Sequence, residues 1–132
     1  MEIKLKFIII LFLSIGIFYS CVDEKACEKG KKYLKTHETY IILESKPKKR
    51  FEDYVLIGKD LYSGTDTTIR LKGRWYETLG KTWNSGDTVI KKKGELIITV
   101  RKMDNTVHFS EWTCEDIYLN GKSIRTGRSR PQ

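Results

Sequence analysis

Cysteine, histidine and proline are scarce in this 132-residue chain, which contains three cysteines, two histidines and two prolines. So small a supply of soft ligands leaves little material for metal or redox chemistry. The chain has no Gly-x-Ser-x-Gly motif, no His-Glu-x-x-His motif and no glycine loop that would hold a phosphate. Its length excludes an enzyme with separate cofactor and substrate domains. We therefore expect neither a cofactor nor catalytic residues.

A long apolar segment is also lacking. The main apolar run extends from Phe7 to Tyr19 and follows the basic residues Lys4 and Lys6. As a helix it would rise about 20 Å, which is short of the roughly 30 Å hydrocarbon layer of a membrane. A basic start followed by a short apolar run is typical of a secretory signal. Residues 1–20 are therefore predicted to be a signal peptide.

The end of this run determines the kind of signal. Cys21 follows Phe18-Tyr19-Ser20, and Phe18 occupies a place where an ordinary signal-peptidase site needs a small residue. The segment resembles a bacterial lipoprotein signal, in which Cys21 becomes the lipid-modified N-terminus. The following Val22 to Lys25 resemble the stretch that Bacteroidetes lipoproteins place there, which is associated with display on the outer face of the outer membrane. The resemblance implies an outer-membrane lipoprotein with several acyl chains on Cys21, which together make a lasting anchor.

The remaining sequence has the pattern of an all-β protein. Residues 21–37 are charged and are predicted to be a lipidated tether or a short helix. From residue 38 onward, short runs of β-branched and aromatic residues alternate with turn signals about every ten residues. We expect about 7–9 short strands over residues 38–125, forming a small antiparallel barrel or a rolled sheet. Residues 126–132 are expected to be a basic mobile tail.

Several local features refine this expectation. Asn120-Gly121 is the strongest two-residue hairpin signal in the chain, whereas Trp75 to Leu79 is predicted to be a short strand. In Gly86 to Leu96, GDTVIKKKGEL, the first glycine is expected to open a strand and Gly94 to sit in a turn with positive φ. This stretch resembles small uncharacterised lipoproteins of Bacteroidetes, and the resemblance brings no activity with it.

The two cysteines other than Cys21 are predicted to form a disulfide between Cys27 and Cys114, because an even pair in a small exported domain usually bridges. A zinc site combining these cysteines with His37 and His108 is disfavoured, since neither pair has the short spacing of structural zinc sites. His108 is also a conceivable base for Cys114. In its strand, however, His108 shares a face with Ser110 that is expected to be solvated, which favours an exposed histidine without a chemical role.

Positive charge is abundant, with 25 Lys and Arg against 17 Asp and Glu and a net charge of +8. The tryptophans Trp75, Trp83 and Trp112 are interpreted as core rather than as a nucleic-acid platform, since an exported protein meets little nucleic acid. Basic turns near a membrane can contact anionic headgroups or acidic polysaccharide, although lysines also keep sheet edges from pairing. The predicted contacts for an anionic ligand are Lys48, Lys49, Arg50, Lys91, Lys92 and Lys93.

Three functional hypotheses remain from the sequence. The first is a non-catalytic, membrane-anchored binding or structural module for an anionic envelope glycan, lipid headgroups or an envelope protein. The second is an inhibitor resembling in outline the small disulfide-bonded β-barrel lipoproteins that block lysozyme, although the positive charge of the chain should repel a basic lysozyme. The third is a small hydrolase that uses His108 with a nearby acid.

Overall fold

The computed structural model describes residues 24–131 of a chain that divides into two compact units, residues 1–33 and residues 34–132. The predicted signal peptide and Cys21 lie outside the described residues. Residues 24–36 form a helix, so the described part of the segment predicted as a tether or a short helix is mainly helical. Across residues 24–131, every helix is too short or too polar to cross a bilayer.

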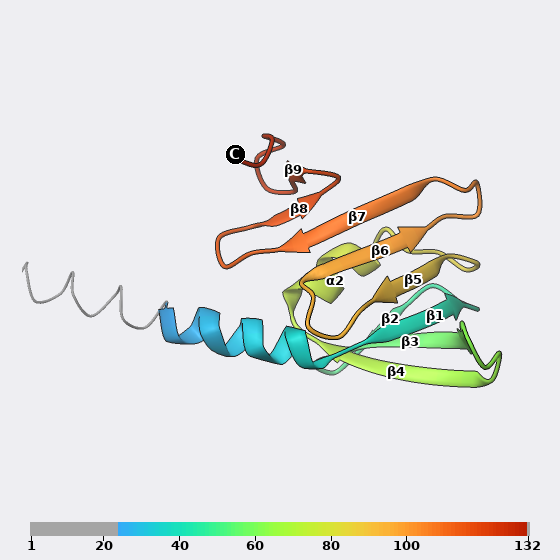
Figure 1. The fold of residues 1–132 in the computed structure, drawn as a ribbon. Helices are drawn as coiled ribbons and strands as arrows, with labels where there is room; N and C mark the ends of the chain where they lie inside the picture. Colours follow the sequence, from blue (N-terminus) through green and yellow to red (C-terminus); the bar gives the residue numbers. More distant parts are fainter. Residues whose placement is uncertain (1–23, 132) are drawn as a thin grey trace, which may run out of the picture. The chain divides into compact units, whose positions relative to one another are not determined.

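Nine antiparallel strands form one sheet, which confirms the prediction of an all-β fold (Figure 1). The sheet is not closed, so it is not the barrel that was one of the two predicted forms. The strands are β1 (Thr39–Leu43), β2 (Lys48–Arg50), β3 (Asp53–Asp60), β4 (Asp66–Lys72), β5 (Thr88–Lys91), β6 (Ile97–Arg101), β7 (Val107–Trp112), β8 (Ile117–Leu119) and β9 (Lys122–Ser123).

Strand β3 has three partners, which determines how one end of the sheet is built. Its first residues, Asp53 to Val55, pair with β2, and its last residues, Gly58 to Asp60, pair with β1. Strand β4 pairs with β3 along nearly its whole length, from Asp53 to Lys59. Because each strand has only two edges, β1 and β2 must follow one another along one edge of β3, with β4 on the other edge. Beyond β1 the order is β5, β6, β7, β8 and β9.

The helix α2 (Arg74–Gly80) covers one face of the sheet, here called the inner face (Figure 1). Trp75 and Tyr76 are each 1% exposed, and the indole Nε1 of Trp75 donates a hydrogen bond of 3.0 Å to Ser110 Oγ in β7. A Cβ atom at Gly80 would lie 2.0 Å from Cε1 of Tyr54, so the helix packs this closely against β3 only because residue 80 is glycine.

The predicted strand at residues 75–79 is therefore wrong. The buried side chains Trp75, Tyr76 and Leu79 recur with helical spacing, and they face the core together. Over seven residues this period is too short to stand out against the β-propensity of tryptophan, tyrosine and threonine. Trp75 and Trp83 are buried, which confirms the interpretation of these two tryptophans as core residues.

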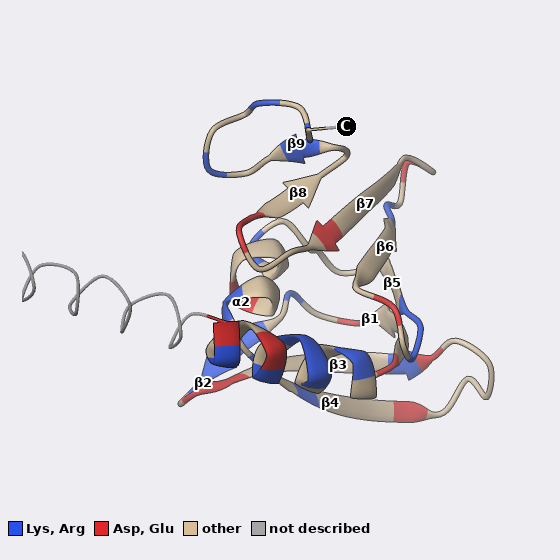
Figure 2. Cartoon of the chain, turned by 60° about the vertical axis from the view of Figure 1, so that its left-hand side comes forward, with Lys and Arg blue, Asp and Glu red and all other residues tan. Residues whose placement is uncertain are grey.

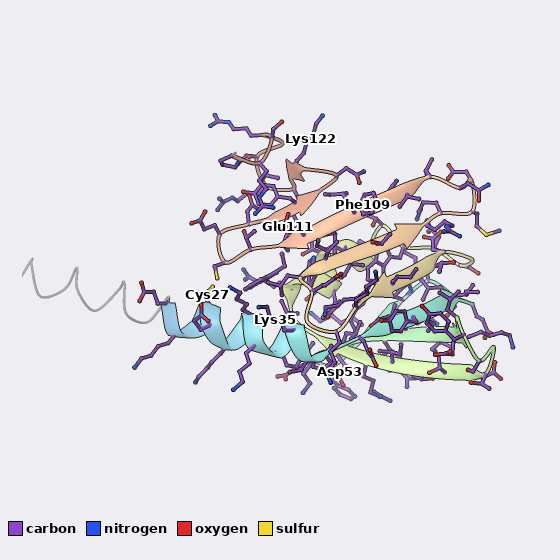
Figure 3. The ribbon with its side chains drawn as sticks, viewed as in Figure 1. Cys27, Lys35, Asp53, Phe109, Glu111 and Lys122 are labelled. Atoms are coloured by element: carbon purple, nitrogen blue, oxygen red, sulfur yellow. The ribbon has the colours of Figure 1, made fainter. Side chains whose placement is uncertain are left out.

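The face assignment expected for β7 is reversed. Val107 and Phe109 (Figure 3 labels Phe109 on β7) are 40% and 54% exposed. Ser110 is buried, and His108 lines the inner face beside it. The physical reason is the hydrogen bond from Trp75, since a buried indole N–H needs an acceptor and Ser110 supplies it. His108 and Ser110 therefore lie toward the core, and Val107 and Phe109 lie on the outer face, opposite α2.

The turns confirm several local predictions. Asn120 and Gly121 both have positive φ, 51° and 80°, as a two-residue hairpin between β8 and β9 requires. Gly94 has φ 84° in the turn after β5, as expected. In the segment predicted to be a mobile tail, Arg130 N donates to the Gly121 carbonyl oxygen and the Arg128 carbonyl oxygen accepts from Ser123 N. Its mobility stays a prediction.

Candidate anionic-ligand surface

The six basic residues predicted to contact an anionic ligand fall into three different places. Lys48, Lys49 and Arg50 form the whole of β2, and all three are exposed. Lys92 and Lys93 are exposed in the connection between β5 and β6. The registers place β2 beside the Asp53 end of β3 and place the Lys91 end of β5 beside Thr39, on the Asp60 side of β3. The two exposed groups thus lie at opposite ends of β3 (Figure 2).

Lys91 is a core residue rather than a surface contact. It is 1% exposed, and its Nζ donates a hydrogen bond of 2.6 Å to the backbone oxygen of His37. Burial lowers the pKa of Lys91, and the nearby carboxylates of Glu95 and Glu38 oppose that effect. Its ammonium group is held by the backbone and does not reach the surface as a ligand contact.

Lys49 is exposed but already has an anionic partner. Its Nζ lies 2.9 Å from Glu77 Oε1, which belongs to α2. The Lys49 ammonium, through this hydrogen bond, lowers the pKa of Glu77. Lys49 therefore connects β2 with α2, and its side chain points to the inner face, as its pairing with Tyr54 also requires.

On the outer face, β4 brings two more cations beside β2. Val55 of β3 lies between Lys48 of β2 and Arg70 of β4. Two residues away, Asp53 of β3 lies between Arg50 of β2 and Lys72 of β4. Residues opposite one another across a ladder share a face of the sheet. Adjacent strands are about 4.8 Å apart, so the cations of β2 and β4 are roughly 10 Å apart across β3. We call this group the basic quartet: Lys48, Arg50, Arg70 and Lys72.

One carboxylate lies in the middle of the basic quartet. Asp53 has one carboxylate oxygen 3.9 Å from Arg70 Nη1 and the other 3.9 Å from Lys72 Nζ. The side chains of Arg70 and Lys72 remain 58% and 62% exposed, so these long ion pairs contribute little to stability. With exposed Glu52 in the adjoining turn, four cations face two carboxylates, and the surface keeps a local excess of positive charge.

An aromatic side chain projects next to the basic quartet. Phe51 follows directly after β2 in the two-residue connection to β3, and it is 98% exposed. Its φ is 57°, a left-handed conformation that is unfavourable for a bulky L-residue and is usually filled by glycine or asparagine. The sequence retains phenylalanine here although it is both strained and unburied.

Sequence reasoning missed Arg70, Lys72 and Phe51. The alternation from Thr68 to Lys72 carried a signal, because the polar residues at every second position of a strand share a face. The sequence did not predict that β2 and β4 lie on opposite sides of β3. For Phe51 the signal was an apolar residue enclosed by charged ones in a short turn, Arg50-Phe51-Glu52.

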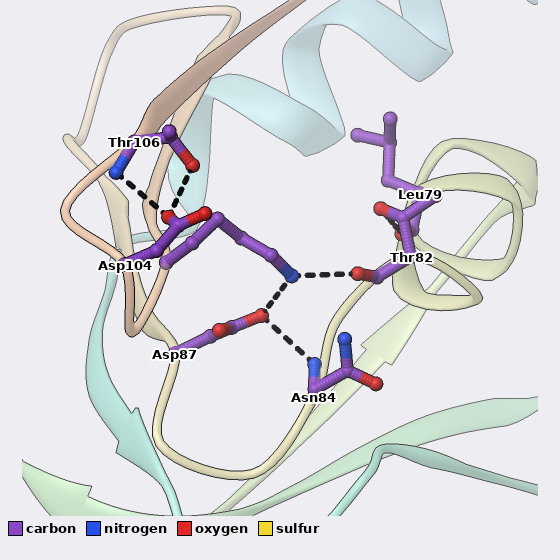
Figure 4. Close-up of polar contacts among 7 residues, drawn as sticks. Leu79, Thr82, Asn84, Asp87, Asp104 and Thr106 are labelled. Carbon is purple, nitrogen blue, oxygen red and sulfur yellow. Dashed lines mark hydrogen bonds and ion pairs between the residues drawn. The ribbon is translucent and has the colours of Figure 1, made fainter.

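The aspartate of the GDTV segment has a structural role in the same unit (Figure 4). Asp87 is 1% exposed and forms an ion pair with Lys102, while its Oδ2 accepts a hydrogen bond of 2.8 Å from the backbone N–H of Asn84. Lys102 Nζ also donates to the Thr82 backbone oxygen at 2.8 Å. This cluster joins the loop after α2 to the end of β6.

The space around His108 is small. The cavity that it lines with Trp83, Ser110 and Leu119 has a volume of about 10 Å³ and admits no organic substrate. The disulfide between Cys27 and Cys114 is present, as predicted, so neither sulfur is a thiolate beside a histidine. Among residues 24–131, no three His, Cys, Asp or Glu side chains gather closely enough to hold a metal ion.

A larger pocket of about 330 Å³ lies near the C-terminal end of the described chain. Its one basic side chain, Arg130, pairs with Glu111 and lies over the ring of Tyr118, 5.9 Å from the ring centroid. Arg130 is thus committed to its neighbours, and the pocket offers no cluster of groups with a common chemical purpose. It is lined by Thr113, Cys114, Glu115, Tyr118, Arg130 and Pro131.

Comparison of the chain with protein-family models, with curated proteins and with solved structures finds no match. The functional argument therefore depends on the geometry described above.

Proposed function

We propose that the protein is a lipid-anchored, non-catalytic binding module of the bacterial cell envelope that holds an anionic partner on the basic quartet. The anchor is the expectation at Cys21, and the location is the outer membrane. The partner presents repeated negative charges, as an acidic polysaccharide or a layer of lipid headgroups does.

The observation that carries this proposal is the register of β2, β3 and β4. It places four cations from two strands on one exposed face, around a single partly buried carboxylate. Lysines on an edge strand also prevent pairing with other chains, and this function accounts for Lys48 and Arg50 in β2. Among the described strands β4 pairs only with β3, so the same function accounts for Arg70 and Lys72. The proposal therefore depends on the local excess of positive charge that the four exposed cations form together.

The electrostatic proposal is tested by removing positive charge either at the Asp53 end of β3 or at its Asp60 end. All proteins carry Cys21→Ser, so that lipid attachment does not mask weaker contacts, and they are titrated with dextran sulfate and with neutral dextran. The variant Lys48→Gln/Arg50→Gln is compared with Lys92→Gln/Lys93→Gln, which loses the same charge at the opposite end. At about 1 kcal/mol for each cation at low salt, the first pair should weaken binding about 30-fold.

The control pair should change binding only slightly, and salt should weaken wild-type binding because exposed charges are screened beyond about 10 Å at 0.1 M. Equal losses in the two variants would show that net charge alone attracts the polymer and would refute a binding site at the basic quartet.

The lipid anchor is tested by a separate measurement. An intact mass of protein purified from membranes should correspond to a chain that starts at Cys21, carries acyl groups and has lost two hydrogens to the disulfide.

A further inference from the structure

We infer that the anionic partner of the basic quartet is a lipid bilayer surface, and that Phe51 enters its interfacial region while the four cations contact the headgroups. The inference rests on the proposed function, which supplies the electrostatic part. It adds an apolar contact with the boundary between headgroups and acyl chains.

Phe51 carries this argument through its conformation as well as its exposure. A single exposed apolar residue is common on protein surfaces and by itself indicates nothing. Phe51, however, combines 98% exposure with φ 57°. An outlier of this kind persists only where the surroundings impose it, and such strain concentrates at functional sites. Glycine would remove the strain at this position, and within residues 24–131 the ring is left almost fully exposed.

The neighbours of Phe51 point to the chemistry of its partner. It follows Arg50 directly, and the basic quartet extends behind it along β2 and β4 on the outer face. Apolar side chains that enter the interface, flanked by Lys and Arg that meet anionic headgroups, are the combination found in proteins that lie on membrane surfaces. The ring supplies apolar burial, and the cations supply attraction to anionic lipid.

The structure also contains a matched control at the other end of β3. Tyr62 is 76% exposed in the β3–β4 turn, but its ring lies against Tyr40, with 5.2 Å between the ring centroids. Its turn contains Asp60 and Asp66, and the Lys59 ammonium there pairs with Asp66. Phe51 and Tyr62 are therefore two exposed aromatic residues at turns of the same strand, one beside cations and the other beside carboxylates.

The test measures sedimentation with large unilamellar vesicles, either pure phosphatidylcholine or a 7:3 mixture of phosphatidylcholine and phosphatidylglycerol, for proteins that all carry Cys21→Ser. Wild type should bind the mixed vesicles more tightly than the neutral ones. Phe51→Ala and Phe51→Gly should each lose about tenfold in affinity for mixed vesicles, because the apolar contact is removed. Tyr62→Ala should bind as wild type does.

Phe51→Gly separates a functional role from a structural one. Glycine accepts φ 57° without strain, so this variant should melt at or above the wild-type temperature while it binds vesicles less well. Binding of dextran sulfate by the same variant should stay at the wild-type level. Equal losses for vesicles and dextran sulfate would mean that Phe51 positions the cations and does not enter a bilayer, which would overturn the inference.

Depth is measured with Phe51→Trp and lipids brominated in the acyl chains. Trp75 and Trp83 are buried and Trp112 is half-buried, and all three are also present in wild type, so the additional quenching relative to wild type reports on residue 51. Quenching no greater than in wild type would overturn the inference.

If wild type fails to bind mixed vesicles but binds dextran sulfate through the basic quartet, the proposed function stands and the bilayer is excluded. If Lys48→Gln/Arg50→Gln binds both probes as wild type does, the proposed function fails as well.

Discussion

Replacing Asp87 by alanine should be among the most destabilising single changes in the sheet. The side chains of Asp87 and Lys102 are 2% and 17% exposed, so the variant leaves the Lys102 ammonium in a largely buried site without its carboxylate, although its hydrogen bond to the Thr82 carbonyl oxygen remains. Removal of one member of a buried ion pair costs about 3–5 kcal/mol. The backbone N–H of Asn84 also loses its carboxylate acceptor. We therefore expect a loss near the upper part of this range.

The assay is urea unfolding at neutral pH followed by tryptophan fluorescence, with the disulfide intact in every protein. For a domain of this size, a loss of about 4 kcal/mol lowers the melting temperature by more than 15 °C. The double variant Asp87→Ala/Lys102→Met removes both charges and should recover about 1–3 kcal/mol relative to the sum of the single losses. A cost below about 1 kcal/mol for Asp87→Ala, or strict additivity in the cycle, would refute the view that this pair is a coupled buried contact.

Three further outcomes follow from the structure. Ser replacement of both Cys27 and Cys114 should lower stability by up to about 4–5 kcal/mol in chemical denaturation, because the disulfide closes a loop of 87 residues, and unchanged stability would contradict this. Trp75→Phe should cost about 1–3 kcal/mol through loss of the Ser110 bond and indole volume, and Ser110→Ala should cost about 1–3 kcal/mol by leaving the indole N–H unsatisfied. In alkaline solution the unfolded Lys91, with a pKa near 10.5, binds more protons than the folded Lys91, whose pKa is lower. The contribution of Lys91 to stability should therefore rise with pH between those two pKa values, and Lys91→Met should lack that rise; parallel pH profiles for the two proteins would count against it.

Local signals predicted what depends on a few neighbouring residues. The Asn120-Gly121 turn needs two positive φ angles, and that requirement can be read from the dipeptide alone. The disulfide followed from the number of cysteines and the expected compartment. In contrast, α2 was missed because seven residues are too few to show a helical repeat of apolar side chains. Its position also depends on the absence of a side chain at Gly80, next to Tyr54.

The candidate site was predicted only in part, for reasons of long-range pairing. The exposure of Lys48 and Arg50 agrees with a basic turn, but their partners on β4 come from a segment about twenty residues later that the sequence did not connect with them. Lys91 shows the opposite problem. Lys91 and Val89 are two residues apart on β5, so they share the inner face. The intervening Ile90 is as apolar as Val89, so the sequence did not show which face of β5 is buried.

The disulfide also gives the chain the topology of a closed ring. Between Cys27 and Cys114 lie α2 and the strands β1 to β7, whereas β8 and β9 lie outside the ring. A protease that cuts once at any exposed turn within the ring, including the turn at Phe51, leaves both fragments joined covalently. If Cys21 carries the anchor, a nicked domain stays attached to the membrane until the disulfide is reduced or a second cut is made.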